Sequence, residues 1–206
     1  MNILSSCTSI VRYKVEGKID GSVMEIVRQG LKKNLIRDID SNASELSIGW
    51  TSSEKPFNPE LIESSLSIAN YLIFSLRIDK KSIPSKIFKK HCAAAITKKL
   101  AETGQEYLSK NEKQGIKDHV NNTLFLRIPA TPNIYDLIWN YEEKILLFFS
   151  TLKVANQELE TLFSKSFKLT LIRLFPYTAA NFIMGLSDSD KDVVSKLSQT
   201  SFVSVD

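Results

Sequence analysis

Residues 80–117 read KKSIPSKIFKKHCAAAITKKLAETGQEYLSKNEKQGIK and contain ten lysines but only three acidic residues. The net charge of this stretch is +7, whereas the whole chain carries +4, so the other 168 residues together carry −3. Positive charge is therefore concentrated in one segment. Such a concentration is typical of a surface that binds phosphate groups.

The same stretch has the pattern of two helices. Pro84 stands where the first turn of a helix tolerates proline, so a helix is expected from 85 to about 109. Its apolar positions recur at helical spacing and define an inward stripe: Phe88, Cys92, Ala95, Ile96 and Leu100. A second helix is expected from 111 to about 126, with these residues facing inward: Ile116, Val120 and Leu124.

The lysines of the first predicted helix are only partly separated from its apolar stripe. At about 100° per residue, Lys86, Lys90 and Lys98 fall roughly opposite the stripe. Lys99 falls inside the apolar arc. A lysine-rich helix face is often merely solvated, but exposed helices usually mix charges of both signs. The shortage of acidic residues therefore favours a polyanion as the partner.

The flanking sequence predicts two small sheet units. Before residue 80 the order is β-α-β-β, with elements at about 8–16, 22–36, 46–50 and 68–79. After residue 130 it is β-β-α-β, with elements at about 133–140, 144–150, 153–165 and 167–175. The predicted class is α+β, with mostly antiparallel or mixed sheets. The chain is thus divided into four segments: a sheet unit at 1–80, a basic helical pair at 81–130, a second sheet unit at 131–186 and a polar, loose tail at 187–206. The second sheet unit is expected to end in a short helix at 177–185.

Composition narrows the class of protein. Hydrophobic residues make up 43% of the chain and charged residues 24%, as in ordinary globular proteins. The longest apolar runs are far shorter than the ~20 residues that span a bilayer. Leu4-Ser5-Ser6-Cys7 resembles a lipoprotein cleavage site but lacks a basic start and an apolar core, so a cytoplasmic protein is expected. Cys7 and Cys92 form no disulfide or zinc pattern.

One set of residues loosely resembles a metal-dependent nuclease. Asp136 is followed by Glu142 and Lys144, and such enzymes place a divalent metal with carboxylates and often a lysine. The competing interpretation is a charged hairpin turn, because Glu142 and Glu143 fall between two predicted strands. We favour the turn and keep a metal-dependent exonuclease as the alternative function.

Other metal and catalytic patterns fail. Segment 188–192 resembles the start of a calcium loop, as does 38–40, but neither has the required Gly at the sixth position or Glu at the twelfth. The only histidines, His91 and His119, could pair across two helices but have no evident further ligands. Glycine-rich phosphate loops and nucleophile elbows are absent from the sequence. No cofactor and no metal are therefore expected.

The basic stretch also resembles a known family. Ile83-Pro84-Ser85, the lysine-rich helix after it, Glu112-Lys113, Ile116-Lys117-Asp118 and Leu126-Arg127 are similar to the RdgC family of bacterial recombination-associated proteins. Two flanking segments support the resemblance: Leu46-Ser47-Ile48-Gly49-Trp50 and Phe167-Lys168-Leu169-Thr170-Leu171. It covers about residues 8–175, and 83–127 is its most specific part.

The resemblance implies a sequence-independent binder of duplex DNA that forms a ring-shaped homodimer and restrains recombinase filaments. The chain departs from the family in three ways. It is shorter, its second helix ends in Leu126-Arg127-Ile128-Pro129 where relatives have an aromatic residue, and Glu106 and Ser109 stand where relatives often carry basic residues. DNA binding is expected to survive these changes better than ring closure.

We therefore expect a non-catalytic, nucleoid-associated, duplex-binding protein, acting as a homodimer with a functional link to a recombinase filament and no membrane contact. Aromatic residues are not interleaved with the lysines, which favours duplex over single strands. A module that binds an acidic protein is a further alternative. The residues predicted to contact phosphates are Lys80, Lys81, Lys86, Lys89, Lys90, Lys98, Lys110, Lys113, Lys117 and Arg127.

Overall fold

The computed structural model describes residues 8–19, 21–59 and 67–197. Its strands are β1 (Val11–Glu16), β2 (Leu46–Thr51), β3 (Ser67–Ile68), β4 (Tyr71–Lys80), β5 (Thr131–Asn140), β6 (Ile145–Phe148) and β7 (Thr170–Arg173). Its helices are α1 (Val23–Lys33), α2 (Ser85–Thr103), α3 (Lys110–Phe125), α4 (Lys153–Phe167), α5 (Pro176–Met184) and α6 (Asp188–Ser195). The predicted α+β class is confirmed.

All the strands belong to one sheet, so the prediction of two separate sheet units was wrong. The strand order is β2-β4-β5-β6-β1-β7, and β3 pairs with β4. The decisive contact joins β4 to β5 along their whole length, from Tyr71 opposite Asn140 to Lys80 opposite Thr131. All the strand pairs are antiparallel. The two predicted units therefore form a single sheet, and the helices α2 and α3 are inserted in the chain between the neighbouring strands β4 and β5.

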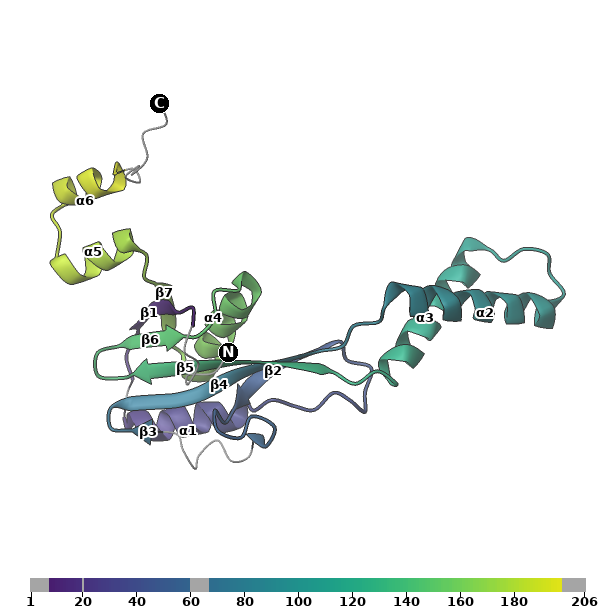
Figure 1. Ribbon diagram of the computed structural model, residues 1–206, viewed down its shortest axis with the longest axis horizontal. Coiled ribbons are helices and arrows are strands. Elements are labelled where there is room, and N and C mark those ends of the chain that lie inside the picture. The colour runs from purple at the N-terminus through teal and green to yellow at the C-terminus, as the bar shows by residue number, and fades with distance from the viewer. Residues whose placement is uncertain (1–7, 20, 60–66, 198–206) are drawn as a thin grey trace.

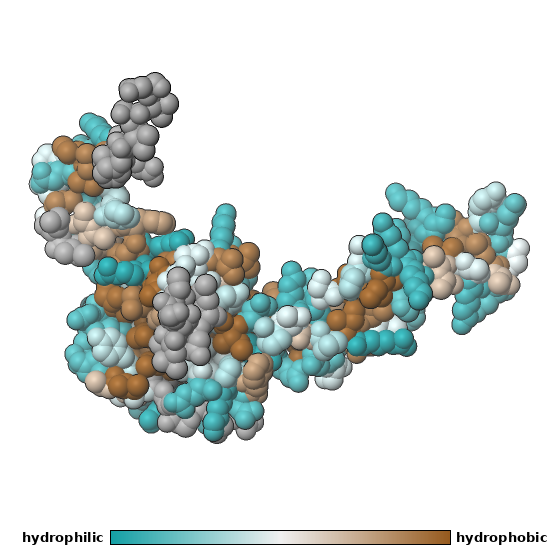
Figure 2. Space-filling view, viewed as in Figure 1, coloured by the Kyte–Doolittle hydropathy of each residue, from teal (hydrophilic) through white to brown (hydrophobic). Residues whose placement is uncertain are grey.

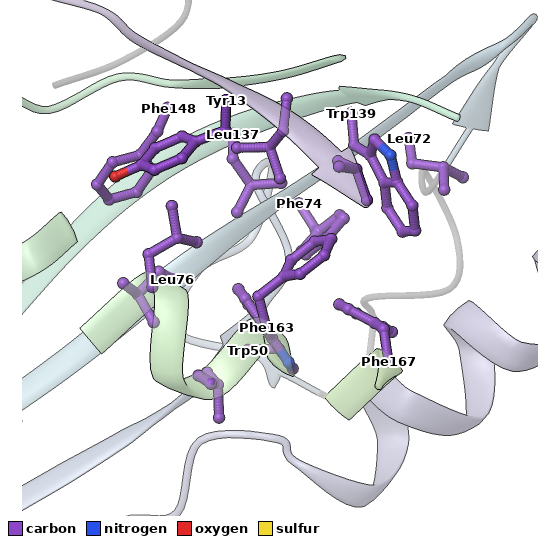
Figure 3. Close-up of a cluster of buried hydrophobic side chains, with 14 of the residues drawn as sticks. Tyr13, Trp50, Leu72, Phe74, Leu76, Leu137, Trp139, Phe148, Phe163 and Phe167 are labelled. Atoms are coloured by element: carbon purple, nitrogen blue, oxygen red, sulfur yellow. The ribbon is translucent and has the colours of Figure 1, made fainter. Parts of the chain in front are cut away.

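The main core lies between the sheet and the helices α1 and α4. Alternate residues of the strands point to this side, because successive side chains of a strand face opposite ways. Trp139 contacts Phe163 edge to face, with 5.1 Å between the ring centroids, and Phe167 stacks against Trp50 at 5.9 Å. Figure 3 shows these rings converging with Phe74 between strand and helix. Aromatic burial on this scale makes the sheet a rigid base for the inserted helices.

Two predicted elements differ from the observed ones. The single strand expected at 68–79 is a tight hairpin of β3 and β4, because Ala69 adopts a left-handed φ of 50° and turns the chain. The tail after Leu186 contains α6, whose first turn is capped by the Ser187 hydroxyl accepting from the Asp190 N–H. Because α6 has no buried side chain, its local interactions, the Ser187 cap and the Lys191–Asp188 ion pair, contribute to forming it.

Candidate nucleic-acid interface

The helices α2 and α3 form an antiparallel pair that extends away from the sheet, and we call residues 83–128 the helical hairpin (Figure 1). The hairpin has a small core of its own, centred on the buried residues Cys92, Val120 and Leu124. Phe88, Ala95 and Ile116 pack around them, as the helical spacing predicted. The hairpin is thus a separately packed arm, which leaves most of its surface free for contact.

Both helix ends at the tip of the hairpin are capped. Gly104 ends α2 in the left-handed conformation, with φ of 65°, which a residue without Cβ adopts at little cost. Ser109 begins α3 through a capping box: its hydroxyl accepts from the Glu112 N–H at 3.3 Å, and the Glu112 carboxylate accepts from the Ser109 N–H at 2.8 Å. The two caps fix where the chain reverses.

Replacing Ser109 with alanine is expected to destabilise the start of α3 by about 1 kcal/mol. The Ser109 hydroxyl and N–H lower the pKa of the Glu112 carboxyl, so the ionised Glu112 stabilises the start of the folded helix. Because this pKa is lowered on folding, the contribution is present above the unfolded-state value and is lost as the pH falls through the folded-state value. Protection factors of the α3 amides against hydrogen exchange measure the stability of this helix start. Protection factors that change neither in S109A nor on acidification would contradict the cap.

The predicted phosphate-contacting residues have exposed side chains, with one exception. The exposed set is Lys80, Lys86, Lys89, Lys90, Lys98, Lys110, Lys113, Lys117 and Arg127. Among them, Lys98 alone forms an ion pair within the described chain, 3.8 Å from Glu102. Such an exposed pair contributes little and does not neutralise the surface. Figure 2 shows hydrophilic residues over much of the hairpin, apart from the apolar seam between the helices.

Lys81 is the exception, and its prediction as a phosphate contact was wrong. Its side chain is fully buried, and its ammonium donates to three backbone carbonyls. The acceptors are Asp40 O at 3.1 Å, Asn42 O at 2.8 Å and Phe125 O at 2.6 Å. An ammonium group has three donors, so all are used. Lys81 therefore joins the loop after α1 to the end of α3 and fixes the base of the hairpin.

The charges surround the hairpin instead of forming one stripe. Lys90 lies about 200° around the helix from the buried Cys92, so it points away from α3. Lys113 comes two helical turns before the buried Val120 and lies on the same face of α3, yet it is exposed. The difference arises because the packed core of the hairpin stops short of its tip. A phosphate backbone can therefore be met from more than one side.

A groove runs between the two helices and contains both histidines. Its inner part, about 310 Å³, is lined by His91, Lys98, His119 and Arg127. Its outer part, about 520 Å³, is lined by Lys98 and by Lys99, which sequence analysis left out because it falls inside the apolar arc. No local signal in the sequence reports where two helices separate, so Lys99 could not have been found that way. Glu102 and Glu112 also line the outer part and balance its two lysines, so the net positive charge of the groove comes from its inner part.

The predicted nuclease residues are not brought together. Asp136 is buried in the middle of β5 and accepts a hydrogen bond from Ser75 Oγ at 2.6 Å. Glu142 lies in the turn after Asn140, whose side chain accepts from the Glu142 and Glu143 N–H groups. Four residues of strand, about 13 Å, separate Asp136 from that turn. The structure supports the interpretation that Glu142 and Glu143 belong to the turn between β5 and β6. The described residues contain no cluster of three metal-ligating side chains.

The two segments that resemble calcium loops have structural roles. Residues 188–192 form the first turns of α6, so their carboxylates do not encircle a common centre. Asp40 caps the end of the hairpin instead, since its carboxylate accepts from the Ala130 N–H at 2.7 Å. Its carbonyl also accepts from Lys81.

None of the described helices is both long and apolar enough to cross a membrane.

These features define the class of protein: an α+β sheet domain that carries a projecting, basic helical hairpin. A family model described as "Putative exonuclease, RdgC" matches residues 9–184. The chain belongs to the RdgC family of recombination-associated proteins, which confirms the resemblance drawn from the basic stretch. No curated protein matches the chain.

Proposed function

We propose that this protein binds duplex DNA without reading its sequence, in the cytoplasm and at the nucleoid, and that it acts in recombination and replication control without catalysis. The observation that carries the proposal is the set of exposed lysines on the helical hairpin. Within the described chain, only one of them, Lys98, forms an ion pair, and that pair with Glu102 is weak. Lysines of this kind displace counterions from phosphates, and that gain does not depend on the bases. Membership of a recombination-associated family supports the same function.

The arrangement of the charges favours positioning on the backbone over reading of bases. Lysine is a flexible point charge, whereas base reading commonly uses bidentate Arg, Asn or Gln. The exposed hairpin aromatic is Tyr107, at the tip, so the arm offers no series of rings on which single-stranded bases could stack. A duplex gripped through its phosphates is the partner that this surface fits.

Reversing three hairpin charges tests the proposal. The variant K86E/K90E/K113E is expected to bind about a hundredfold more weakly at moderate salt, and the slope of log affinity against log salt should flatten by about one unit per lysine. Fluorescence anisotropy with two unrelated duplex sequences measures both. The matched control is K32E/K33E/K153E, which reverses exposed lysines on α1 and α4 and should bind nearly as the parent does.

Unequal losses on the two sequences would contradict sequence-independent binding, and normal binding by the hairpin variant would contradict the site. The same reactions test the absence of catalysis. Linear DNA should stay intact with Mg²⁺ or Mn²⁺; degradation that Glu142→Ala abolishes would establish the exonuclease instead. Strong binding of an acidic protein with no binding of DNA would favour the interaction module.

We further propose that the protein acts as a homodimer and that it opposes a recombinase filament. The hairpin exposes several large apolar side chains that a second copy could cover: Ile87, Tyr107 and Leu126. Sedimentation equilibrium gives the mass in solution, and comparing binding to closed circular and linear duplex of equal sequence tests for a ring. A monomer at working concentrations would overturn the dimer while leaving DNA binding intact.

A further inference from the structure

A cavity of about 350 Å³ lies at the end of the sheet opposite the hairpin, and no part of the proposed DNA interface uses it. The end of β1, the turn between β5 and β6 and the start of β7 enclose it. Figure 1 places this turn at the far end of the sheet from α2 and α3. A volume of this size suits a small ligand.

The floor of the cavity is apolar and belongs to the main core. Val15, Trp139 and Leu169 line it and are each 3% exposed or less. Gly17 lines it as well, and a Cβ there would come within 2.6 Å of Leu169. The cavity is thus an open end of the core, which favours the apolar part of a ligand.

The mouth of the cavity is positively charged. Lys18, in the segment after β1, and Lys144, in the turn between β5 and β6, line the mouth, and both are exposed. Among the lining residues that the structure describes, none is acidic. Val23 brings in the first turn of α1, whose cap residue Ser22 makes no side-chain hydrogen bond, so the helix end also favours negative charge. The mouth therefore fits an anion.

Trp139, in the floor of the cavity, carries an indole N–H that can report on this end of the core. Trp139 Nε1 is buried and has no hydrogen-bond partner among the described residues. The other tryptophan, Trp50, is equally buried but donates from Nε1 to Ser166 Oγ at 2.8 Å. Buried polar groups are nearly always paired, because leaving one unpaired is unfavourable. Because this N–H is closed even to a water-sized contact, a ligand in the cavity packs against the Trp139 ring and not against Nε1.

We propose that this cavity binds a small amphipathic carboxylate. Its apolar body lies against Val15, Trp139 and Leu169 in the floor, and its carboxylate accepts from the ammonium groups of Lys18 and Lys144 at the mouth. A carboxylate has enough lone pairs for all these donors. The proposal is independent of DNA binding, since the cavity and the hairpin lie at opposite ends of β4 and β5.

The two tryptophans provide the test. In ¹⁵N-labelled full-length protein the indole groups give two side-chain N–H signals, which Trp139→Phe assigns. Octanoate is expected to shift the Trp139 signal saturably, with a dissociation constant on the order of 1 mM or below. The Trp50 signal should not move. Octanamide and octylamine, which lack the negative charge, should bind at least about fivefold more weakly.

Charge-removing variants separate the site from general apolar binding. Lys18→Gln and Lys144→Gln should each weaken octanoate binding about fivefold, whereas the control Lys153→Gln, on α4 and outside the cavity, should not. Equal shifts of both indole signals, equal binding of octylamine, or unchanged binding by the two variants would overturn the proposal. The absence of any saturable shift would show that the cavity does not take such a ligand.

Discussion

Replacing Lys81 with methionine is expected to lower the free energy of unfolding by about 3–5 kcal/mol, because removing one side of a buried, charged hydrogen-bond set leaves its partners unpaired. The three carbonyls that lose their donor belong to Asp40, Asn42 and Phe125, so the loop after α1 and the end of α3 lose their common attachment. Methionine keeps most of the length and the apolar stem of lysine, so the lost packing is small. Urea unfolding followed by circular dichroism gives the value.

The control for this prediction is Lys80→Met, which removes an exposed ammonium one residue away and should change stability by about 0.5 kcal/mol or less. DNA binding distinguishes the two lysines further. K80M should reduce the salt dependence of binding by about one unit, whereas K81M, measured where it is folded, should leave it unchanged. Equal stability of the two variants would show that Lys81 does not hold the hairpin base.

Replacing Gly49 with alanine is expected to destabilise the protein by about 3 kcal/mol, at the upper end of overpacking effects. A Cβ at this position would lie 2.4 Å from both the N and the Cα of Ile36 and 2.7 Å from the Leu35 carbonyl carbon, all of them backbone atoms. That backbone cannot retreat freely, because the Ile36 N–H donates to Trp50 O and the Trp50 N–H donates to Asn34 O. Thermal unfolding of the variant measures the loss.

Gly115→Ala is the matched control, since the same methyl group is added in the middle of α3 with no atom within 4 Å. Alanine favours a helix interior over glycine, so this variant should be more stable by about 0.5–1 kcal/mol. Opposite signs for the two substitutions are the expected result. If G49A were as stable as the parent, the chain crossing beside β2 would have to be looser than the structure has it.

The elements that could be predicted are those with strong local signals. The α2 and α3 stripes follow from 3.6-residue periodicity, and the structure buries Cys92, Val120 and Leu124 as expected. The exposure of most of the lysines follows from the same periodicity together with the cost of burying charge. The class of the site, a basic surface on a helical pair, could therefore be predicted from the sequence alone.

What failed to emerge from the sequence depends on contacts between distant residues. Pairing of β4 with β5 makes one sheet out of two apparent units, and it joins strands separated by the whole hairpin. Lys81 looks like its neighbour Lys80 in sequence, yet three carbonyls from distant segments receive its ammonium. Periodicity describes which way a side chain points from its own helix or strand, and it cannot say which other segment is waiting there.

The sequence by itself determined the α+β class, most of the element order and the basic helical pair, because these depend on the local pattern of apolar and charged residues. Its resemblance in particular motifs pointed to the RdgC family. Only the tertiary structure decided that the sheet is single, that Lys81 is buried and that Asp136 and Glu142 lie apart. It also created the cavity beside Trp139. These features come from the meeting of segments far apart in the chain, where the burial of core aromatics and the pairing of buried polar groups select one arrangement.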